Sequence, residues 1–511
     1  MKKSIGYALL SSMLLGSLAP SAASGADAKT EPLISSYETE YGHSSLVKSD
    51  GTYWIWGMAN LPSVPTQLQG LTDVTATFGD NFLKKTDGSL WYWSKATQST
   101  GMNLYKIEGI QDPVDVPFVY GDNAIVIDAK GDVYKGSQSY PDYIPGPYTK
   151  LAGIDNVKEV SLYGDSLAQK TIFVFLKKDG TVWRTDATYS TFVQAQEIVG
   201  AERVQADGVY LKDGTIREWP SSYNVAGYDK VKGDWASTSS IPVKGLPERL
   251  IFAWRNGTSN VAIDEQRRLW FWGATITGWS DGTTMNSQPA PIRLTGVQDV
   301  KEAYVAGRSL FALTQSGKVY EASIELRDMP ANAEFKLLAS DVVNMKPASK
   351  HLLMQKTDGT LWGWGLNKYG SLGIGEDKEV EIRTPVQLQT PIEVVLNGES
   401  IALTNGVITR NGQAFVPLRS IFEKLGARIS WEAESKIATL EREATGQTAA
   451  VAMKINLKDG TTTLNGETVK LQNDPFGASG TSYLPLRFIS ETLGAKVEWQ
   501  QKAGKIVITM S

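Results

Sequence analysis

The sequence contains no cysteine and only two histidines among 511 residues. Without cysteine the chain cannot form disulfide bonds, so we expect burial of apolar side chains to stabilise it, and 15 Trp, 20 Tyr and 14 Phe supply the material. An excess of charge of either sign is also lacking, because 51 basic residues face 55 acidic ones, for a net charge of −4. Nucleic-acid binding needs a positively charged surface, and no basic run stands out, so we expect no nucleic-acid partner.

Long apolar runs are lacking except near the N-terminus. Lys2-Lys3 precede an apolar stretch from Ile5 to Leu18, and small residues follow from Ala19 to Ala28. This is the pattern of a secretory signal peptide, and the run is shorter than the ~20 residues that a membrane span needs. We therefore expect a signal peptide at 1–28, no membrane span in the mature chain, and a secreted or extracellular location that includes the cell wall. The missing cysteine excludes lipid attachment behind the signal and favours a Gram-positive source.

A short β-hairpin motif recurs through most of the chain. Its last copy, from Leu352 to Gly365, has an Asp358-Gly359 turn followed by Trp362 and Trp364 on one strand face. Eight copies align on the turn, at Gly51, Gly88, Gly131, Gly180, Gly214, Arg267-Arg268 (which lacks the glycine), Gly317 and Gly359. The first and last of these glycines lie 308 residues apart, a mean of 44 over seven intervals. A β-rich repeat of about 40–50 residues predicts a propeller with blades of about four strands.

The last copy continues as Trp364-Gly365-Leu366-Asn367-Lys368-Tyr369-Gly370-Ser371-Leu372-Gly373. This resembles the RCC1-type repeat (regulator of chromosome condensation), W-G-x-N-x-x-G-x-L-G, and Trp56-Gly57 and Trp272-Gly273 keep its start. The resemblance implies an RCC1-like β-propeller over residues 29–390. We expect eight repeats, or seven blades if the short fifth repeat merges with a neighbour. Fold alone does not give an activity.

Residues 391–511 are a tandem duplication, with halves at about 392–445 and 449–511. Asn397-Gly398 matches Asn465-Gly466, Pro417-Leu418-Arg419 matches Pro485-Leu486-Arg487, and Trp431 matches Trp499, each at an offset of 68. Apolar residues at helical spacing predict helices near 417–425 and 485–493. We therefore expect a mainly β protein whose tail is a small α+β domain of two ββαββ-like halves.

The segment from Phe415 to Trp431 reads F-V-P-L-R-x-I-x-E-x-L-G-A-x-I-x-W. It resembles the N-terminal domain of copper amine oxidases, which is common in secreted proteins of Bacillus- and Paenibacillus-type bacteria. In the oxidases this domain is a stalk, distant from the copper and the tyrosine-derived cofactor. Copper(II) sites rely on imidazole or thiolate ligands, and the tail has neither His nor Cys. We therefore expect no cofactor, no metal site and no amine oxidase activity.

Some aromatic residues lie outside the hairpin pattern, in loops between repeats. We predict ligand contacts for these: Tyr140, Tyr143, Tyr148, Tyr223 and Trp279. The W-x-W pairs, 54/56, 91/93, 270/272 and 362/364, could stack on sugars, but their fixed phase favours a core between blades. The turn aspartates 50, 87, 179, 213 and 358 could suggest calcium, but Asx turns explain them without a metal.

Four residues of the tail are expected to be structural: Arg419, Arg487, Trp431 and Trp499. The two arginines fall in a first helical turn, where the helix dipole disfavours a cation. We expect each to pair with carbonyls or a carboxylate inside its half, and binding of a ligand carboxylate is the alternative.

The two histidines, His43 and His351, each lie eight residues before a turn glycine. They should therefore occupy equivalent places in the first and last blades, which become neighbours if the ring closes. A bridging ligand or metal site is one interpretation, and a strand-end histidine that bonds locally is the one we favour.

These patterns favour a secreted, non-catalytic binding protein. Its propeller would recognise an extracellular or cell-envelope protein or glycan, and its tail would act as an attachment or spacer module. The alternative is an extracellular polysaccharide hydrolase or lyase, because scattered carboxylates could converge into an acidic site on the propeller face.

Overall fold

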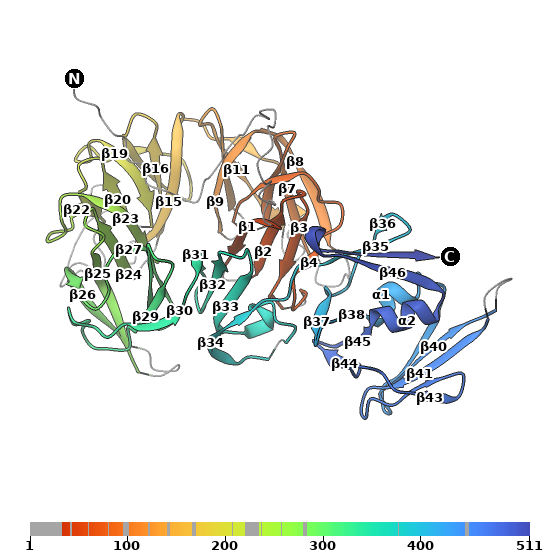
Figure 1. The fold of residues 1–511 in the computed structure, drawn as a ribbon. Helices are drawn as coiled ribbons and strands as arrows, with labels where there is room; N and C mark the ends of the chain where they lie inside the picture. Colours follow the sequence, from red (N-terminus) through yellow and green to blue (C-terminus); the bar gives the residue numbers. More distant parts are fainter. Residues whose placement is uncertain are drawn as a thin grey trace, which may run out of the picture. The chain divides into compact units, whose positions relative to one another are not determined.

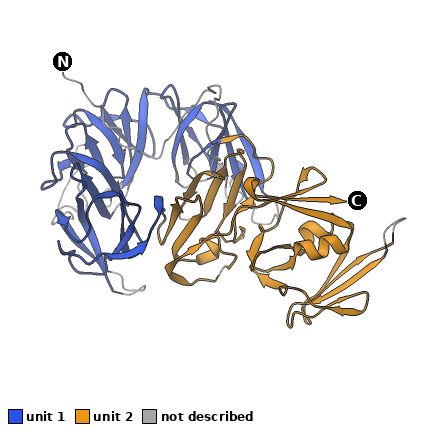
Figure 2. Ribbon diagram, in the orientation of Figure 1, with its two compact units in different colours: residues 1–30, 75–347 blue, residues 31–74, 348–511 orange. Residues whose placement is uncertain are grey.

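The computed structural model describes residues 33–510, except for 41–42, 60, 80, 96–101, 121–122, 140–143, 166–169, 207, 220–234, 237, 257, 279–283, 377 and 445–448. The expected signal peptide at 1–28 lies outside the described residues. By its internal contacts the chain divides into two units (Figure 2). The first comprises residues 1–30 and 75–347, and the second comprises residues 31–74 and 348–511.

Eight four-stranded sheets follow one another in the described part of residues 33–390 (Figure 1). The first four contain β1 (Ile34–Thr39), β2 (Ser44–Lys48), β3 (Tyr53–Trp56) and β4 (Thr66–Gln67); β5 (Val74–Thr77), β6 (Phe82–Lys85), β7 (Ser89–Ser94) and β8 (Asn103–Gln111); β9 (Pro113–Tyr120), β10 (Asn123–Asp128), β11 (Val133–Gly136) and β14 (Thr149–Lys150); and β15 (Val157–Asp165), β16 (Lys170–Lys177), β17 (Val182–Asp186) and β18 (Val193–Gln194). A separate hairpin, β12 (Gln138–Ser139) and β13 (Ile144–Pro145), interrupts the third sheet.

The other four sheets have the same order of consecutive strands. They contain β19 (Ala201–Gln205), β20 (Gly208–Leu211), β21 (Ile216–Glu218) and β22 (Ile241–Pro242); β23 (Leu250–Arg255), β24 (Ser259–Asp264), β25 (Leu269–Thr277) and β26 (Thr284–Leu294); β27 (Val300–Ala306), β28 (Ser309–Thr314), β29 (Val319–Ser323) and β30 (Lys336–Ala339); and β31 (Val342–Pro347), β32 (His351–Lys356), β33 (Leu361–Leu366) and β34 (Glu381–Gln387). The short 3₁₀ turn η2 (Lys368–Gly370) follows β33. The short fifth repeat thus forms a sheet of its own, so the repeats number eight.

Apolar side chains between successive sheets make the core. The second strands β2, β24 and β28 are buried along their whole length, including the polar residues at their ends. In the first unit, Val261 and Phe271 of one sheet share a cluster with Ala303 and Leu310 of the next. In the second unit, Leu46 of the first sheet packs in one cluster with Leu353 of the last. The sheets are therefore the blades of a β-propeller, as the repeat period predicted.

The tail forms three sheets with strand orders β36-β35-β47-β46, β37-β38-β45-β44 and β39-β40-β41-β42-β43. Its elements are β35 (Glu393–Leu396), β36 (Glu399–Ser400), β37 (Ile408–Arg410), β38 (Gln413–Pro417), α1 (Leu418–Phe422), β39 (Arg428–Glu432), β40 (Ile437–Arg442), β41 (Val451–Asn456), β42 (Thr462–Leu464), β43 (Glu467–Val469), β44 (Phe476–Ala478), β45 (Thr481–Pro485), α2 (Leu486–Thr492), β46 (Ala495–Gln500), η3 (Gln501–Ala503) and β47 (Lys505–Met510). The two helices confirm the prediction of one helix per half.

Each half keeps the expected ββαββ order, as β37-β38-α1-β39-β40 and β44-β45-α2-β46-β47, but its strands do not form a sheet of their own. Every tail sheet combines strands of both halves, and β38 pairs antiparallel with β45. In that pairing Val416 lies opposite Leu484, its own equivalent at the offset of 68. An antiparallel pair centred on equivalent residues is the arrangement of a local two-fold axis, so the duplicated segments pack as a pseudo-symmetric pair. Among the described residues, no helix has the length and apolar character needed to cross a membrane.

Candidate functional site

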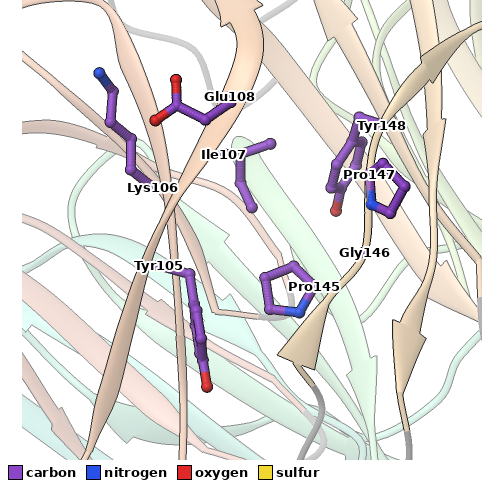
Figure 3. Close-up of a pocket in the computed structure, with 8 residues that line it drawn as sticks. All are labelled: Tyr105, Lys106, Ile107, Glu108, Pro145, Gly146, Pro147 and Tyr148. Atoms are coloured by element: carbon purple, nitrogen blue, oxygen red, sulfur yellow. The ribbon is translucent and has the colours of Figure 1, made fainter.

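A pocket of about 350 Å³ lies between the outer strand of the second sheet and the loop before β14 of the third. Figure 3 shows Tyr105 opposite Pro145, and Ile107 opposite Tyr148. Eight residues line it: Tyr105, Lys106, Ile107, Glu108, Pro145, Gly146, Pro147 and Tyr148. The pocket therefore presents two tyrosine rings and two proline rings, with one cation and one carboxylate nearby.

Strand alternation positions the β8 side of the pocket. Ile107 is 4% exposed and belongs to the core of the second and third sheets, and Tyr105 packs against that core, while Lys106 and Glu108 are exposed. The Tyr105 ring stacks on that of Tyr92, which lies opposite it on β7, with the ring centroids 6.3 Å apart. The aromatic wall is thereby fixed by the sheet and does not depend on a mobile side chain.

Tyr148 is the described member of the predicted contact residues, and it is half-buried. A Cβ added to Gly136 would lie 2.3 Å from the Tyr148 ring, so only glycine lets the ring lie this close to β11. The phenol oxygen is buried and has no hydrogen-bond partner in the part of the chain that the structure describes. Burial, and then the neighbouring Tyr92, raise the pKa of Tyr148 well above its ordinary value, so the hydroxyl stays protonated and keeps a donor without an acceptor. The other four predicted contacts, Tyr140, Tyr143, Tyr223 and Trp279, lie outside the described residues.

The W-x-W pairs are part of the core, as their phase predicted. Trp54, Trp56, Trp93, Trp272 and Trp364 are at most 2% exposed. Trp91, Trp270 and Trp362 are half-buried, and each donates its indole N–H to a side-chain oxygen of its own hairpin. These rings therefore pack within and between the blades and do not form a sugar-stacking surface.

The turn aspartates form Asx turns, as predicted. Asp358 Oδ1 accepts the backbone N–H of Thr360 at 2.9 Å and its hydroxyl at 2.6 Å, and the Thr360 hydroxyl accepts the indole N–H of Trp362. The Lys356 ammonium lies 4.0 Å from the centre of the Trp362 ring. Equivalent lysines and hydroxyl residues, which the sequence argument missed, complete the turns at Asp50, Asp87 and Asp179. Among the described residues, no group of three or more His, Cys, Asp or Glu side chains is placed to hold a metal ion.

The two histidines occupy equivalent turns at the start of the second strand of their sheets. The His43 carbonyl accepts the N–H of Glu40, and the His351 carbonyl accepts that of Ala348, both at 2.9 Å. His351 Nε2 lies 2.6 Å from Thr39 Oγ1 of the first sheet, so the last sheet contacts the first, as the repeat phase predicted. Burial lowers the pKa of both histidines to about 4, which leaves them neutral at pH 7.

The two tail arginines lie on the exposed faces of their helices, and Arg487 has a carboxylate of its own half as a partner, as expected. Arg419 and Arg487 are exposed, because Leu418 and Ile421, and their equivalents in α2, take the buried face of each short helix. Arg487 lies 4.0 Å from Glu491 one turn later, and both side chains are more than half exposed. Trp431 packs against the tail core, whereas Trp499 is 42% exposed. Of the four residues expected to be structural, only Trp431 therefore contributes to the described core.

One carboxyl group of the propeller has an unusual acidity. Burial, and then the charge of Glu159 on the neighbouring sheet, raise the pKa of Asp115 on β9 to about 7. Glu159 Oε2 itself accepts the backbone N–H of Val204 at 2.9 Å, one sheet further along the chain. Glu302 on β27 accepts the backbone N–H of Met345 on β31 in the same way, at 3.4 Å. A glutamate on the first strand of a sheet therefore links it to the first strand of the next sheet.

Comparison with known proteins agrees with both parts of this architecture. The family model of the regulator of chromosome condensation (RCC1) repeat matches residues 358–397, and that of the copper amine oxidase N-terminal domain matches residues 395–508. The ultraviolet-B receptor UVR8 of Arabidopsis thaliana is 22% identical over 191 residues, which are 35% of this chain and 43% of the receptor. This chain thus combines RCC1-like propeller repeats with a copper amine oxidase N-terminal-like domain, a combination suited to an interaction module.

Solved structures with detectable likeness include yeast RCC1 (Prp20) bound to Kap60, at 12% identity and a TM-score of 0.36, covering 72% of this chain and 77% of that one. The designed protein Ika8 is 17% identical with a TM-score of 0.41, covering 66% and 96% of the two chains. The Dos1 propeller is 10% identical with a TM-score of 0.39, covering 64% and 90%.

Proposed function

We propose that this chain is a secreted, non-catalytic binding protein whose propeller recognises a cell-envelope glycan or protein. The pocket between Tyr105 and Tyr148 carries the proposal. Its two tyrosine and two proline rings offer flat apolar surfaces, with Lys106 and Glu108 at its edge. Such surfaces suit the apolar face of a sugar ring or an extended proline-containing peptide.

The N-terminal pattern from Lys2 to Ala28 supports an extracellular location, and attachment to the cell wall is part of the proposal. In this account the tail contributes to attachment outside the cell. Arg419, Arg487 and Trp499 are exposed and give it a surface for contacts outside the domain.

The test measures binding of the full chain to purified cell-wall material and to a panel of soluble envelope polysaccharides. Tyr105→Ala removes the aromatic wall and should weaken binding at least tenfold. Tyr369→Ala is the matched control, because Tyr369 is 47% exposed in the turn η2 of the last repeat and does not line the pocket. Equal losses for the Tyr105 and Tyr369 variants, or no loss for either, would contradict a role of the pocket.

A second candidate function, a polysaccharide hydrolase or lyase, is favoured by one observation. Asp115 has a pKa raised to about 7 beside Glu159, and a carboxyl group that keeps its proton near neutral pH can serve as a general acid. Turnover of an envelope polysaccharide that Asp115→Asn abolishes would favour this function over binding.

A further inference from the structure

The turn between β2 and β3 differs from its equivalents in burial. Four hairpins share the spacing Lys-x-Asp-Gly-Thr/Ser-x-Trp, with their lysines at Lys48, Lys85, Lys177 and Lys356. The Lys48 side chain is 1% exposed, whereas that of Lys177 is 19% exposed, and Lys85 and Lys356 are half-buried. Because the four hairpins share one sequence pattern, their own residues do not explain the difference. The Lys48 ammonium donates to the carbonyl of Ala503 at 3.0 Å, so the C-terminal domain covers this turn.

Four charged side chains alternate in sign where the domain meets the turn. Lys48 lies 3.6 Å from Asp50, Asp50 lies 3.9 Å from Lys505, and Lys505 lies 2.8 Å from Glu393. Glu393 is 8% exposed and Lys505 32%, so water screens the charges only in part. A hydrogen bond from Lys505 to Glu393 raises the pKa of Lys505, which is consistent with a charge held by its partner. Removing one member would leave a buried charge unpaired.

An apolar and polar seam continues beside these charges. Val64 of the first sheet's loop forms one buried cluster with Ile408, Phe415 and Tyr483 of the C-terminal domain. The side chain of Asn405 accepts the N–H of Ser63 at 3.1 Å and donates to its hydroxyl at 3.2 Å.

Gly406 shows how closely the two backbones approach at this seam. A Cβ on Gly406 would lie 2.3 Å from the Pro65 carbonyl oxygen, so the seam requires glycine there. The carbonyl of Gly406 also accepts the hydroxyl of Tyr483 at 3.0 Å. The backbone of the domain at Gly406 and that of the first sheet's loop at Pro65 are therefore in direct contact.

The connection between the last sheet and the domain is short and buried. β34 ends at Gln387 and β35 begins at Glu393. Within and just after this connection, Leu388 is 6% exposed, Ile392 is 4% exposed and Pro391 is buried. A flexible spacer would instead expose a polar segment to water.

We propose that the duplicated C-terminal domain is a structural clasp for the first sheet of the propeller. The first sheet reaches its full stability only while the domain is folded and docked on the turn at Lys48 and the loop at Val64. The domain therefore does not act as an independently hinged spacer. This inference does not depend on the proposed ligand of the propeller.

The test follows backbone hydrogen exchange by mass spectrometry in the full-length chain. Ile489→Val removes one methylene from the domain core, where Ile489 is 0% exposed in α2 and absent from the cluster at the seam. A change of this kind should speed exchange about two- to tenfold in the domain peptide 481–485. If the domain is a clasp, peptide 44–56 of the first sheet should accelerate by the same factor, while peptide 259–272 of the other unit stays unchanged.

Ile263→Val is the matched control, because Ile263 is also 0% exposed but belongs to β24 of the other unit. It should accelerate peptide 259–272 and leave 44–56 unchanged. The reciprocal variant Val64→Ala, on the first-sheet side of the seam, should accelerate peptide 481–485. Faster exchange confined to the domain in Ile489→Val, with peptide 44–56 at its original rate, would overturn the clasp.

Discussion

At the scale of single residues, one carboxylate organises each Asp-Gly hairpin. In the turns at Asp50, Asp87, Asp179 and Asp358, it accepts both the N–H and the hydroxyl of the residue two positions on. That hydroxyl orients the tryptophan indole, and a lysine ammonium lies over the ring. The aspartate, glycine and tryptophan could be recognised from spacing alone. The lysine and hydroxyl stand at equally fixed spacing, and that regularity was the signal available for them.

In the sixth repeat a different aspartate, Asp264 at the end of β24, accepts the hydrogen bonds of the turn. Asp264, whose side chain is fully buried, accepts the N–H of Arg268 at 2.9 Å, its Nε at 2.6 Å and the indole N–H of Trp270 at 3.0 Å. We expect Asp264→Ala to destabilise its sheet by about 2–3 kcal/mol, because it removes a charge-assisted bond and leaves the half-buried Trp270 indole donor and the Arg268 N–H without their acceptor. Urea unfolding measures this, with Asp299→Asn as the control. Asp299 is 60% exposed, and asparagine tolerates its left-handed backbone (φ +55°) as aspartate does, so this change should alter stability by less than about 0.5 kcal/mol.

Arg267 takes the position that glycine has in the other repeats. Its φ of +58° is in the left-handed region, which costs a side chain roughly 1–2 kcal/mol relative to glycine. Its ion pair with Asp299 is long, at 3.8 Å, and exposed. We therefore expect Arg267→Gly to stabilise the protein by about 1 kcal/mol in the same unfolding measurement. A destabilised variant would mean that the arginine side chain contributes more than its conformation costs.

At the scale of elements, the sequence predicted the duplicated helices but not how the two halves combine. The offset of 68 and the helical spacing from Leu418 to Leu425 locate α1 and α2. The strands of the tail pair with segments far away in the chain. For example, β35 pairs in parallel with β47, which lies more than 100 positions later. A pattern within one half contains no information on such pairings, so separate ββαββ sheets were the wrong inference.

This sharing of sheets predicts how fragments of the tail should behave. Neither residues 392–445 nor residues 449–511 should fold alone, because every tail sheet takes strands from both halves. Each fragment leaves unpaired strand edges and an open core. Circular dichroism during heating should show no cooperative transition for either fragment. A cooperative transition in one of them would show that a half can complete its own core.

The buried histidines of the first and last sheets predict a dependence of stability on pH. Each folded-state pKa is lowered to about 4 from 6.5, so the unfolded chain binds more protons between these values. Stability should therefore fall as pH drops from 6.5 towards 4, by up to about 1.4 kcal/mol per pH unit for each histidine. Unfolding of the His43→Gln, His351→Gln double variant at pH 7 and pH 5 should show a smaller loss than the original chain. An equal loss in both would assign the effect to other groups.

At the scale of the whole molecule, the repeat period of 44 was enough to predict a β-propeller with eight repeats, and the motif from Trp364 to Gly373 supplied the resemblance to RCC1-type repeats. The period reports the size of a blade, and every blade has the same hairpin in the same phase. The candidate site was less accessible to prediction. Tyr148 could be predicted as a ligand contact because it lies outside the hairpin repeat. Tyr105 lies on a regular strand, so the sequence does not mark it. Only the packing of the second sheet against the loop of the third brings the two rings to one pocket. The Lys48 turn is buried because the C-terminal domain covers it, and the sequence around Lys48 alone does not predict this contact.

In the proposed function, this chain binds an envelope ligand outside the cell without transforming it. Incubation of the full chain with purified envelope polysaccharide tests this when bound protein and released reducing or unsaturated sugar ends are measured in the same sample. We expect saturable binding that Tyr105→Ala weakens, with no sugar ends released above the protein-free control. Product that accumulates beyond one end per protein chain, and that disappears with Asp115→Asn, would show instead that the propeller is catalytic.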